Sequence, residues 1–178
     1  MPAVNLDEPV EITDQAPHLA GRFRGERERL RLGLATATLK FEHIGSTAVR
    51  GLAGRPIVDL MLGAPPAAWE ALPDLRARIV ALGYEDLGNA GVPGSISFCR
   101  RTLRAFNLGL VALDGPLWRE NLTLRDYLRA HPAAAAGYAA AKRAAVAGGA
   151  TRLLAYSTAR APALTALIEK ARAWRAAD

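Results

Sequence analysis

Hydrophobic residues in the middle of the chain recur at every second position, which is the period of a half-buried β-strand. The segment 104–113 shows this most cleanly, because Phe106, Leu108 and Leu110 are each separated by one residue. Shorter apolar runs bounded by Gly or Pro indicate further strands. The sequence predicts strands at residues 39–44, 56–62, 84–87, 96–102 and 104–113.

Elsewhere the apolar positions recur every three to four residues, the period of an amphipathic helix. In the first such segment Leu19, Phe23, Leu30 and Leu34 lie near one face, with Arg and Glu between them. Pro73 is expected to divide the second helix into two pieces. The predicted helices cover residues 17–38, 67–82, 116–130, 132–147 and 151–174.

This order of elements predicts an α+β fold in a single domain, residues 1–178. Residues 17–115 combine strands with helices, whereas residues 116–178 contain helices only. We expect a small mixed sheet flanked by helices and covered by the C-terminal helical region. The Gly-rich loop at 88–95 is either a mobile lid or a hairpin connection.

Composition limits the class of protein. A chain of 178 residues with 51% hydrophobic content can build a proper core. Its apolar runs are shorter than a membrane span, and its first residues lack the apolar core of a secretory signal. The single cysteine, Cys99, excludes an internal disulfide and a cysteine-based metal cluster. We therefore expect a cytoplasmic protein with no membrane partner.

The formal net charge of +6 is compatible with nucleic-acid binding. Nearly all the basic residues are arginines, however, and they are scattered through every predicted element. Together with the abundant alanine, this scatter indicates codon bias rather than a binding stripe. We therefore do not expect a nucleic-acid partner, although a small anionic substrate would be attracted by the same charge.

A glycine and two hydroxyl residues, Gly45, Ser46 and Thr47, follow the first predicted strand. The glycine lets the backbone come close to a ligand, and the hydroxyl and N–H groups after it are donors for a phosphate. The alternative is an ordinary turn in which Ser46 or Thr47 caps a helix. His43, just before the turn, is expected to pack or cap rather than to act as a base.

Asp59 is the one acid within the apolar strand 56–62. An unpaired carboxylate in such a place is costly, so it either faces an open cleft or pairs with a cation such as Arg55. In a cleft it would offer the oxygen ligand that a hard cation prefers. Both interpretations remain open from the residues alone.

Three blocks of the sequence combine into a recognisable pattern. The first comprises 43–49 (HIGSTAV), 51–53 (GLA) and 56–59 (PIVD), and the second comprises 124–132 (LRDYLRAHP) with Tyr138 and Lys142. The third, weaker, is Tyr156 followed by Arg160. Together these blocks resemble the GrpB family, and the resemblance covers nearly the whole chain.

The GrpB family belongs to the nucleotidyltransferase superfamily, whose fold is shared with DNA polymerase beta. The resemblance implies nucleotide or phosphate binding at Gly45, Ser46 and Thr47, and a catalytic, Mg²⁺-binding carboxylate at Asp59. Arg55 stands where the family usually has Lys, and a cation there would suit a triphosphate. The implied cofactor is Mg²⁺.

The sequence departs from the superfamily pattern where further carboxylates are expected. The position two residues after Asp59 is Met61, and a thioether does not ligate Mg²⁺. On the matching strand the chain has Asn107 and Gly109, where relatives carry a His-Leu-His-like run. Asn107 can hydrogen-bond a sugar or base but supplies no charge. The sequence therefore supports the fold more firmly than it supports two-metal transfer.

Three basic residues of the second block are further candidates for binding phosphate. Arg125 and Arg129 are one helical turn apart and could meet an anion together. The alternative is a solvated face on which Asp126 pairs with Arg129. Lys142, one turn after Tyr138, has the same two interpretations.

The hypothesis that follows is a nucleotidyltransferase-like protein that binds a nucleotide or another phosphorylated small molecule and transfers a nucleotidyl group with Mg²⁺. The alternative is a non-catalytic binding or accessory protein that kept the fold and lost the metal-binding carboxylates. A coenzyme A-linked helper role is conceivable, because relatives are sometimes fused to dephospho-coenzyme A kinase. A basic RNA-binding module is the least favoured class, since no aromatic stacking platform is visible.

Overall fold

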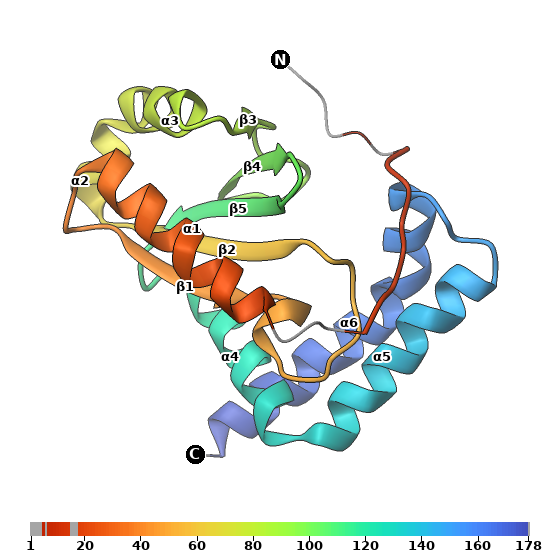
Figure 1. Ribbon diagram of the computed structural model, residues 1–178. Helices are drawn as coiled ribbons and strands as arrows, with labels where there is room; N and C mark the ends of the chain where they lie inside the picture. The colour runs from red at the N-terminus through yellow and green to blue at the C-terminus, as the bar shows by residue number, and fades with distance from the viewer. Residues whose placement is uncertain (1–4, 6, 15–17, 178) are drawn as a thin grey trace.

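One five-stranded sheet forms the centre of the computed structural model, which describes residues 5, 7–14 and 18–177 (Figure 1). The strand order is β1-β2-β5-β4-β3, with β2 and β5 parallel and the other neighbours antiparallel. The predicted α+β fold with a small mixed sheet is confirmed. The strands are β1 (Lys40–Ile44), β2 (Val58–Ala64), β3 (Glu85–Asp86), β4 (Ser95–Arg101) and β5 (Ala105–Ala112).

Helices flank the sheet and continue beyond it (Figure 1). The predicted second helix is divided at Ala71, because Pro73 lies in the first turn of a new helix, where its missing N–H costs nothing. The first helix ends at Leu34 rather than at residue 38, and Ala35 after it has a left-handed φ of 46°. Its predicted start at Pro17 lies outside the described residues. The helices are α1 (Leu19–Leu34), the 3₁₀ helix η1 (Ser46–Ala48), α2 (Pro66–Glu70), α3 (Leu72–Ala81), α4 (Pro116–Ala130), α5 (Pro132–Ala147) and α6 (Leu153–Ala176).

The alternation of side chains along β2 gives the sheet two different faces. Val58, Leu60 and Leu62 are buried in a core shared with α1 and α3. Met61, on the opposite face, packs in a small cluster that includes Trp118 of α4. Asp59 shares this second face with Met61, so the polar end of β2 is directed toward the helical region.

The helical region is attached to the sheet through the loop that follows η1. Val49, Leu52 and Ala53 of this loop are buried in one cluster with side chains of α4, α5 and α6. The loop therefore leads the chain from the edge of β1 to the helices and back to the start of β2. No helix in the described part of the chain is long and apolar enough to cross a membrane.

The N-terminal segment 7–14 runs between the sheet and the helical region (Figure 1). Isolated backbone bridges join Pro9 to Arg152 and Thr13 to Gly54. Because Arg152 directly precedes α6 and Gly54 lies in the loop before β2, the segment ties these two parts together.

Candidate functional site

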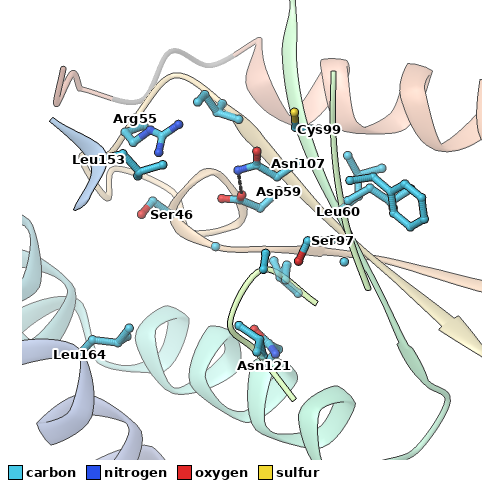
Figure 2. A pocket seen from close by; sticks show the side chains of 18 of the residues that line it. Ser46, Arg55, Asp59, Leu60, Ser97, Cys99, Asn107, Asn121, Leu153 and Leu164 are labelled. Atoms are coloured by element: carbon cyan, nitrogen blue, oxygen red, sulfur yellow. Dashed lines mark hydrogen bonds between the residues drawn. The ribbon is translucent and has the colours of Figure 1, made fainter. Parts of the chain in front are cut away.

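A cavity of about 730 Å³ lies between the second face of the sheet and the helices α4, α5 and α6 (Figure 2). Most of the residues proposed from the sequence contribute to its wall, although they come from separate strands, helices and loops. Those that line it are Gly45, Ser46, Arg55, Asp59, Asn107, Arg125 and Lys142. Thr47 and Arg129 are not among the lining residues.

Gly45 and Asp59 are in contact because β1 and β2 pair with Ile44 opposite Asp59. Gly45 has a φ of 69°, a conformation that favours glycine. A Cβ atom at this position would collide with Oδ2 of Asp59. The glycine is therefore needed both for the turn and for the close approach of the carboxylate.

Asp59 lies directly opposite Asn107 in the parallel pair of β2 and β5. Nδ2 of Asn107 donates a hydrogen bond of 2.7 Å to Oδ1 of Asp59 (Figure 2). Burial raises the pKa of Asp59, and the hydrogen bond from Asn107 opposes the rise without cancelling it. Asp59 does not form the ion pair with Arg55 that the sequence left open. Arg55 instead donates to Glu8 at 2.9 Å.

Lys142 of α5 brings a cation into the wall of the cavity. It is only 2% exposed, and its Nζ donates to Oγ of Ser46 at 2.7 Å and to the carbonyl of Ala53. The ammonium also lies 4.7 Å from the centre of the Tyr138 ring. Burial, with a smaller contribution from Arg160, lowers the pKa of Lys142 to about 8. Lys142 lines the cavity and is not part of a solvated face, so that alternative was wrong, whereas phosphate binding by Lys142 stays a prediction.

Arg160 adds a second cation next to Lys142. Its Nη1 donates to the hydroxyl of Tyr138 at 2.8 Å, and its guanidinium lies 5.5 Å from the centre of the Tyr156 ring. Arg160, Tyr138 and Tyr156 all line the cavity. The two aromatic rings thus hold the cation in place without neutralising it.

The two hydroxyl groups after Gly45 do not cap a helix, so that interpretation was wrong. The side chain of Ser46 accepts from Lys142, and Oγ1 of Thr47 lies 2.8 Å from Nε2 of His43. His43 stacks on Phe23 with ring centres 4.4 Å apart. Burial and the neighbouring arginines lower the pKa of His43 to about 4. His43 is a packed, neutral histidine, as predicted.

The two arginines of α4 support the local structure more than they form a pair. Arg125 donates to Glu42 at 2.6 Å and to Asp126 at 2.8 Å, and it reaches the cavity wall. Arg129 donates to the carbonyl of Ala48 at 2.9 Å and lies 3.6 Å from Asp126. The structure thus brings Arg125, but not Arg129, to the cavity.

Sequence reasoning missed Glu8 and Arg101, which meet at the edge of the cavity. Nε of Arg101 donates to Glu8 at 2.7 Å, and Nη2 donates to Oδ1 of Asn107 at 2.8 Å. Hydrogen bonds from Arg101 and attraction to Arg55 outweigh burial and lower the pKa of Glu8. No periodic pattern marks the N-terminal segment, and 93 residues separate Glu8 from Arg101, so only the folded chain reveals this contact.

The side chains at Asp59 do not fit a resident Mg²⁺ ion. Mg²⁺ needs several oxygen ligands, but the neighbour on β2 is Met61 and Asn107 points its N–H group at Asp59. In the described part of the chain, no three His, Cys, Asp or Glu residues are grouped so that they could hold a metal ion. Five basic side chains, but only three carboxylates, line the cavity, so the arrangement favours an anion over a cation.

A family model described as GrpB protein matches residues 9–170. The chain belongs to the GrpB family. The match extends from the N-terminal segment into α6 and therefore includes most of the residues that line the cavity, although Glu8 lies just outside it. The family resemblance inferred from the sequence is confirmed.

Curated relatives of this GrpB-family protein include YqkA of Bacillus subtilis, which is 32% identical over 135 residues, 75% of this chain and 39% of YqkA. The glutamate-rich protein GrpB of Alkalihalophilus pseudofirmus is 26% identical over 152 residues, 80% of this chain and 84% of that protein. The chain thus spans less than half of YqkA but most of the second relative.

Among solved structures, the conserved protein GrpB from Enterococcus faecalis matches with a TM-score of 0.76 and 25% identity. The match covers 90% of this chain and 98% of that chain. Cid1 poly(U) polymerase also matches, with a TM-score of 0.47 and 20% identity over 66% of this chain and 38% of that chain. A likeness of that size says nothing about the activity of the present protein.

Proposed function

We propose that this GrpB-family protein binds a nucleotide or another phosphorylated small molecule in the cavity. In this proposal the phosphate lies at the cationic end of the cavity, beside Ser46, Lys142 and Arg160. The planar or sugar part of the ligand extends toward Asp59 and Asn107. The nucleotidyltransferase-like character of the family supports this class of ligand.

One observation carries the proposal, namely the buried ammonium of Lys142. Within the described part of the chain no carboxylate pairs with it, and its polar contacts are the hydroxyl of Ser46 and the carbonyl of Ala53. Burying a charge without a counter-charge is costly. A protein gains from such an arrangement when an anionic ligand supplies the missing charge in the bound state.

Thermal-shift measurements with nucleoside triphosphates in EDTA test the proposal. We expect the wild type to be stabilised, and Lys142→Met to bind about 10- to 100-fold more weakly because charge-assisted hydrogen bonds to phosphate are lost. Lys170→Met, which changes an exposed lysine of α6, is the matched control and is expected to bind normally. Arg160→Gln is a second test, in case the first variant folds poorly.

Equal shifts for the wild type, Lys142→Met and Arg160→Gln would contradict the proposal, because the ligand would then lie elsewhere. The absence of a shift with every triphosphate and with inorganic phosphate would contradict it as well. Salt-sensitive retention of RNA in that case would favour the RNA-binding alternative.

A second candidate is nucleotidyl transfer with Mg²⁺, the activity that the family resemblance implies. It is favoured by Oδ2 of Asp59, which accepts no hydrogen bond from the described residues while its carboxylate lines the cavity. A thermal shift that requires Mg²⁺ and disappears in Asp59→Asn would support transfer. A shift that is independent of Mg²⁺ and survives in Asp59→Asn would support the non-catalytic binding or accessory protein.

A further inference from the structure

A chain of hydrogen bonds runs from the N-terminal segment to the carboxylate of Asp59. Glu8 accepts from Arg101 at 2.7 Å, Arg101 donates to Oδ1 of Asn107 at 2.8 Å, and Nδ2 of Asn107 donates to Asp59 at 2.7 Å. Figure 2 shows Asn107 and Asp59 side by side at the centre of the cavity wall. Each link has the length of a strong hydrogen bond.

Arg101 determines which way the amide of Asn107 points. A guanidinium has five donors and no acceptor, so only the oxygen of the amide can face it. The NH₂ group must then face Asp59. Arg101 is itself fixed on two sides, because it also donates to the carbonyl of Phe106 at 2.9 Å. The orientation of Asn107 therefore follows from the position of Arg101.

This orientation leaves no pair of oxygen atoms for a divalent cation. Oδ1 of Asp59 already accepts an N–H, and the oxygen of Asn107 is occupied by Arg101. A cation placed between the two side chains would meet an NH₂ group and lie close to a guanidinium charge. Oδ2 of Asp59 remains available as an acceptor, close to Gly45 in the turn that follows β1.

We propose that Arg101 is a positioning residue which, through Asn107, keeps Asp59 as a hydrogen-bond acceptor and excludes divalent cations from the site. The cavity accordingly takes a ligand without a bound metal ion, a phosphorylated small molecule whose own hydroxyl or amino group donates to Asp59. The proposed class of ligand rests on the proposed function, because that function accounts for the phosphate of the ligand. The exclusion of cations does not, and it can be tested without any ligand.

The exclusion of divalent cations is tested with Mn²⁺ and no other ligand. Binding is measured by the loss of the signal of free Mn²⁺ in electron paramagnetic resonance. We expect the wild type to show no saturable site that depends on Asp59, as judged against Asp59→Asn. Asn107→Asp supplies a second carboxylate but leaves Arg101 beside it. The double variant Arg101→Gln, Asn107→Asp is expected to bind Mn²⁺ at least 10-fold more tightly than Asn107→Asp alone.

A double variant with Arg104→Gln in place of Arg101→Gln is the matched control, because Arg104 is an exposed arginine in the turn between β4 and β5. It is expected to bind Mn²⁺ like Asn107→Asp alone. A wild type that binds Mn²⁺ through Asp59 as tightly as the Arg101 double variant would overturn the proposal. Equal binding by the two double variants would also overturn it, since Arg101 would then have no special role.

Titration calorimetry in EDTA with inorganic phosphate and ribose 5-phosphate tests the ligand class. We expect ribose 5-phosphate to bind about 10-fold more tightly than phosphate, and this preference to disappear in Asp59→Asn while phosphate still binds. An undiminished preference in Asp59→Asn would refute the donor contact. If neither probe binds, the proposed function and the ligand class both fail, and the Mn²⁺ experiment still decides whether Arg101 excludes cations.

Discussion

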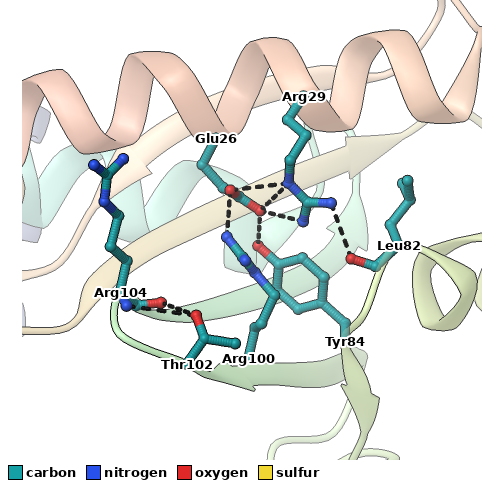
Figure 3. Close-up of polar contacts among 7 residues, drawn as sticks. All are labelled: Glu26, Arg29, Leu82, Tyr84, Arg100, Thr102 and Arg104. Atoms are coloured by element: carbon teal, nitrogen blue, oxygen red, sulfur yellow. Dashed lines mark hydrogen bonds and ion pairs between the residues drawn. The ribbon is translucent and has the colours of Figure 1, made fainter.

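Glu26 and Asp59 are two carboxylates that lie on opposite faces of the same sheet, and their surroundings differ. Glu26 of α1 is 5% exposed and accepts hydrogen bonds from Arg29, from Arg100 and from the hydroxyl of Tyr84 (Figure 3). Asp59 accepts one hydrogen bond from the described residues, from Asn107. The first carboxylate is surrounded by donors, whereas the second keeps one oxygen free beside a cavity.

The pKa values of the two groups shift in opposite directions for this reason. Burial acts to raise the pKa of Glu26, but the hydrogen bonds from Arg29 and Tyr84 outweigh it, so the pKa is lowered. At Asp59 burial outweighs the bond from Asn107, and the pKa is raised. A buried carboxylate that is paired with cations stabilises the fold. A buried carboxylate without such a partner, whose pKa is raised, is typical of a binding or catalytic site.

The largest effect that would test this comparison is expected at Glu26. Glu26→Gln keeps the shape but leaves Arg29 and Arg100 without their common counter-charge. The free energy of unfolding should fall by about 4 kcal/mol, the usual cost of removing one partner of a buried ion pair. Urea denaturation measures it, with thermal unfolding as a second probe.

Glu28→Gln is the matched control, because Glu28 pairs with Arg31 at 2.7 Å on the exposed side of the same helix. Its loss should have little effect on the free energy of unfolding, because an exposed ion pair is screened by solvent. If both variants lost the same small amount, Glu26 would not be the structural carboxylate of the comparison.

The fold was predictable from the sequence because most elements show their period locally. The strand at 104–113 and the helices at 116–130 and 132–147 agree with β5, α4 and α5 to within one residue. Element ends were less accurate, since the left-handed Ala35 that follows α1 leaves no mark in the hydrophobic pattern.

The residues of the site were predictable from the sequence only where they lie close together along the chain. The turn after β1 and the acid on β2 stand in one continuous motif. The sequence also indicated the strand that carries Asn107, but the parallel register that puts Asn107 opposite Asp59 is visible only in the structure. The contacts of Lys142 with Ser46 and of Arg101 with Glu8 join segments 96 and 93 residues apart. No local pattern specifies such pairs, because packing of the helical region and of the N-terminal segment brings them together.

Lys142 is a buried cation that forms no ion pair with the described residues, so its charge, like that of Asp59, lacks a partner. Its pKa is about 8 in the folded protein and 10.5 in its ordinary state, so between these pH values the unfolded chain binds more protons than the folded one. The free energy of unfolding should therefore rise with pH across this window, by about 3 kcal/mol at most. Denaturation of the wild type and of Lys142→Met at a series of pH values measures the difference. A difference between the two that stays constant from pH 8 to 10.5 would contradict the lowered pKa.

The smallest expected effect, and the one whose sign is most informative, is at Asp59. In the unfolded chain the carboxyl group of Asp59 loses its proton near pH 3.8. Because the pKa of Asp59 is raised in the folded protein, the folded state keeps this proton to a higher pH. Stability is therefore lost as the pH rises through the folded pKa. Asp59→Asn removes this loss while keeping an oxygen that can accept from Asn107. We expect the variant to be more stable than the wild type at pH 7 by about 1 kcal/mol, the usual size of a stabilising substitution, and the gain to shrink toward pH 4.

Asp86→Asn provides the matched control with the opposite sign. Asp86 is also partly buried, but hydrogen bonds from Arg76 and from the N–H of Gly88 outweigh burial and lower its pKa. Its charge therefore stabilises the fold at neutral pH, and this contribution is lost as the pH falls through the lowered pKa. Asp86→Asn should accordingly be less stable than the wild type at pH 7, while Asp59→Asn is more stable. Destabilisation by both substitutions would show that the charge of Asp59 is already matched within the protein, and the distinction between a structural and a functional carboxylate would fail at the residue that defines it.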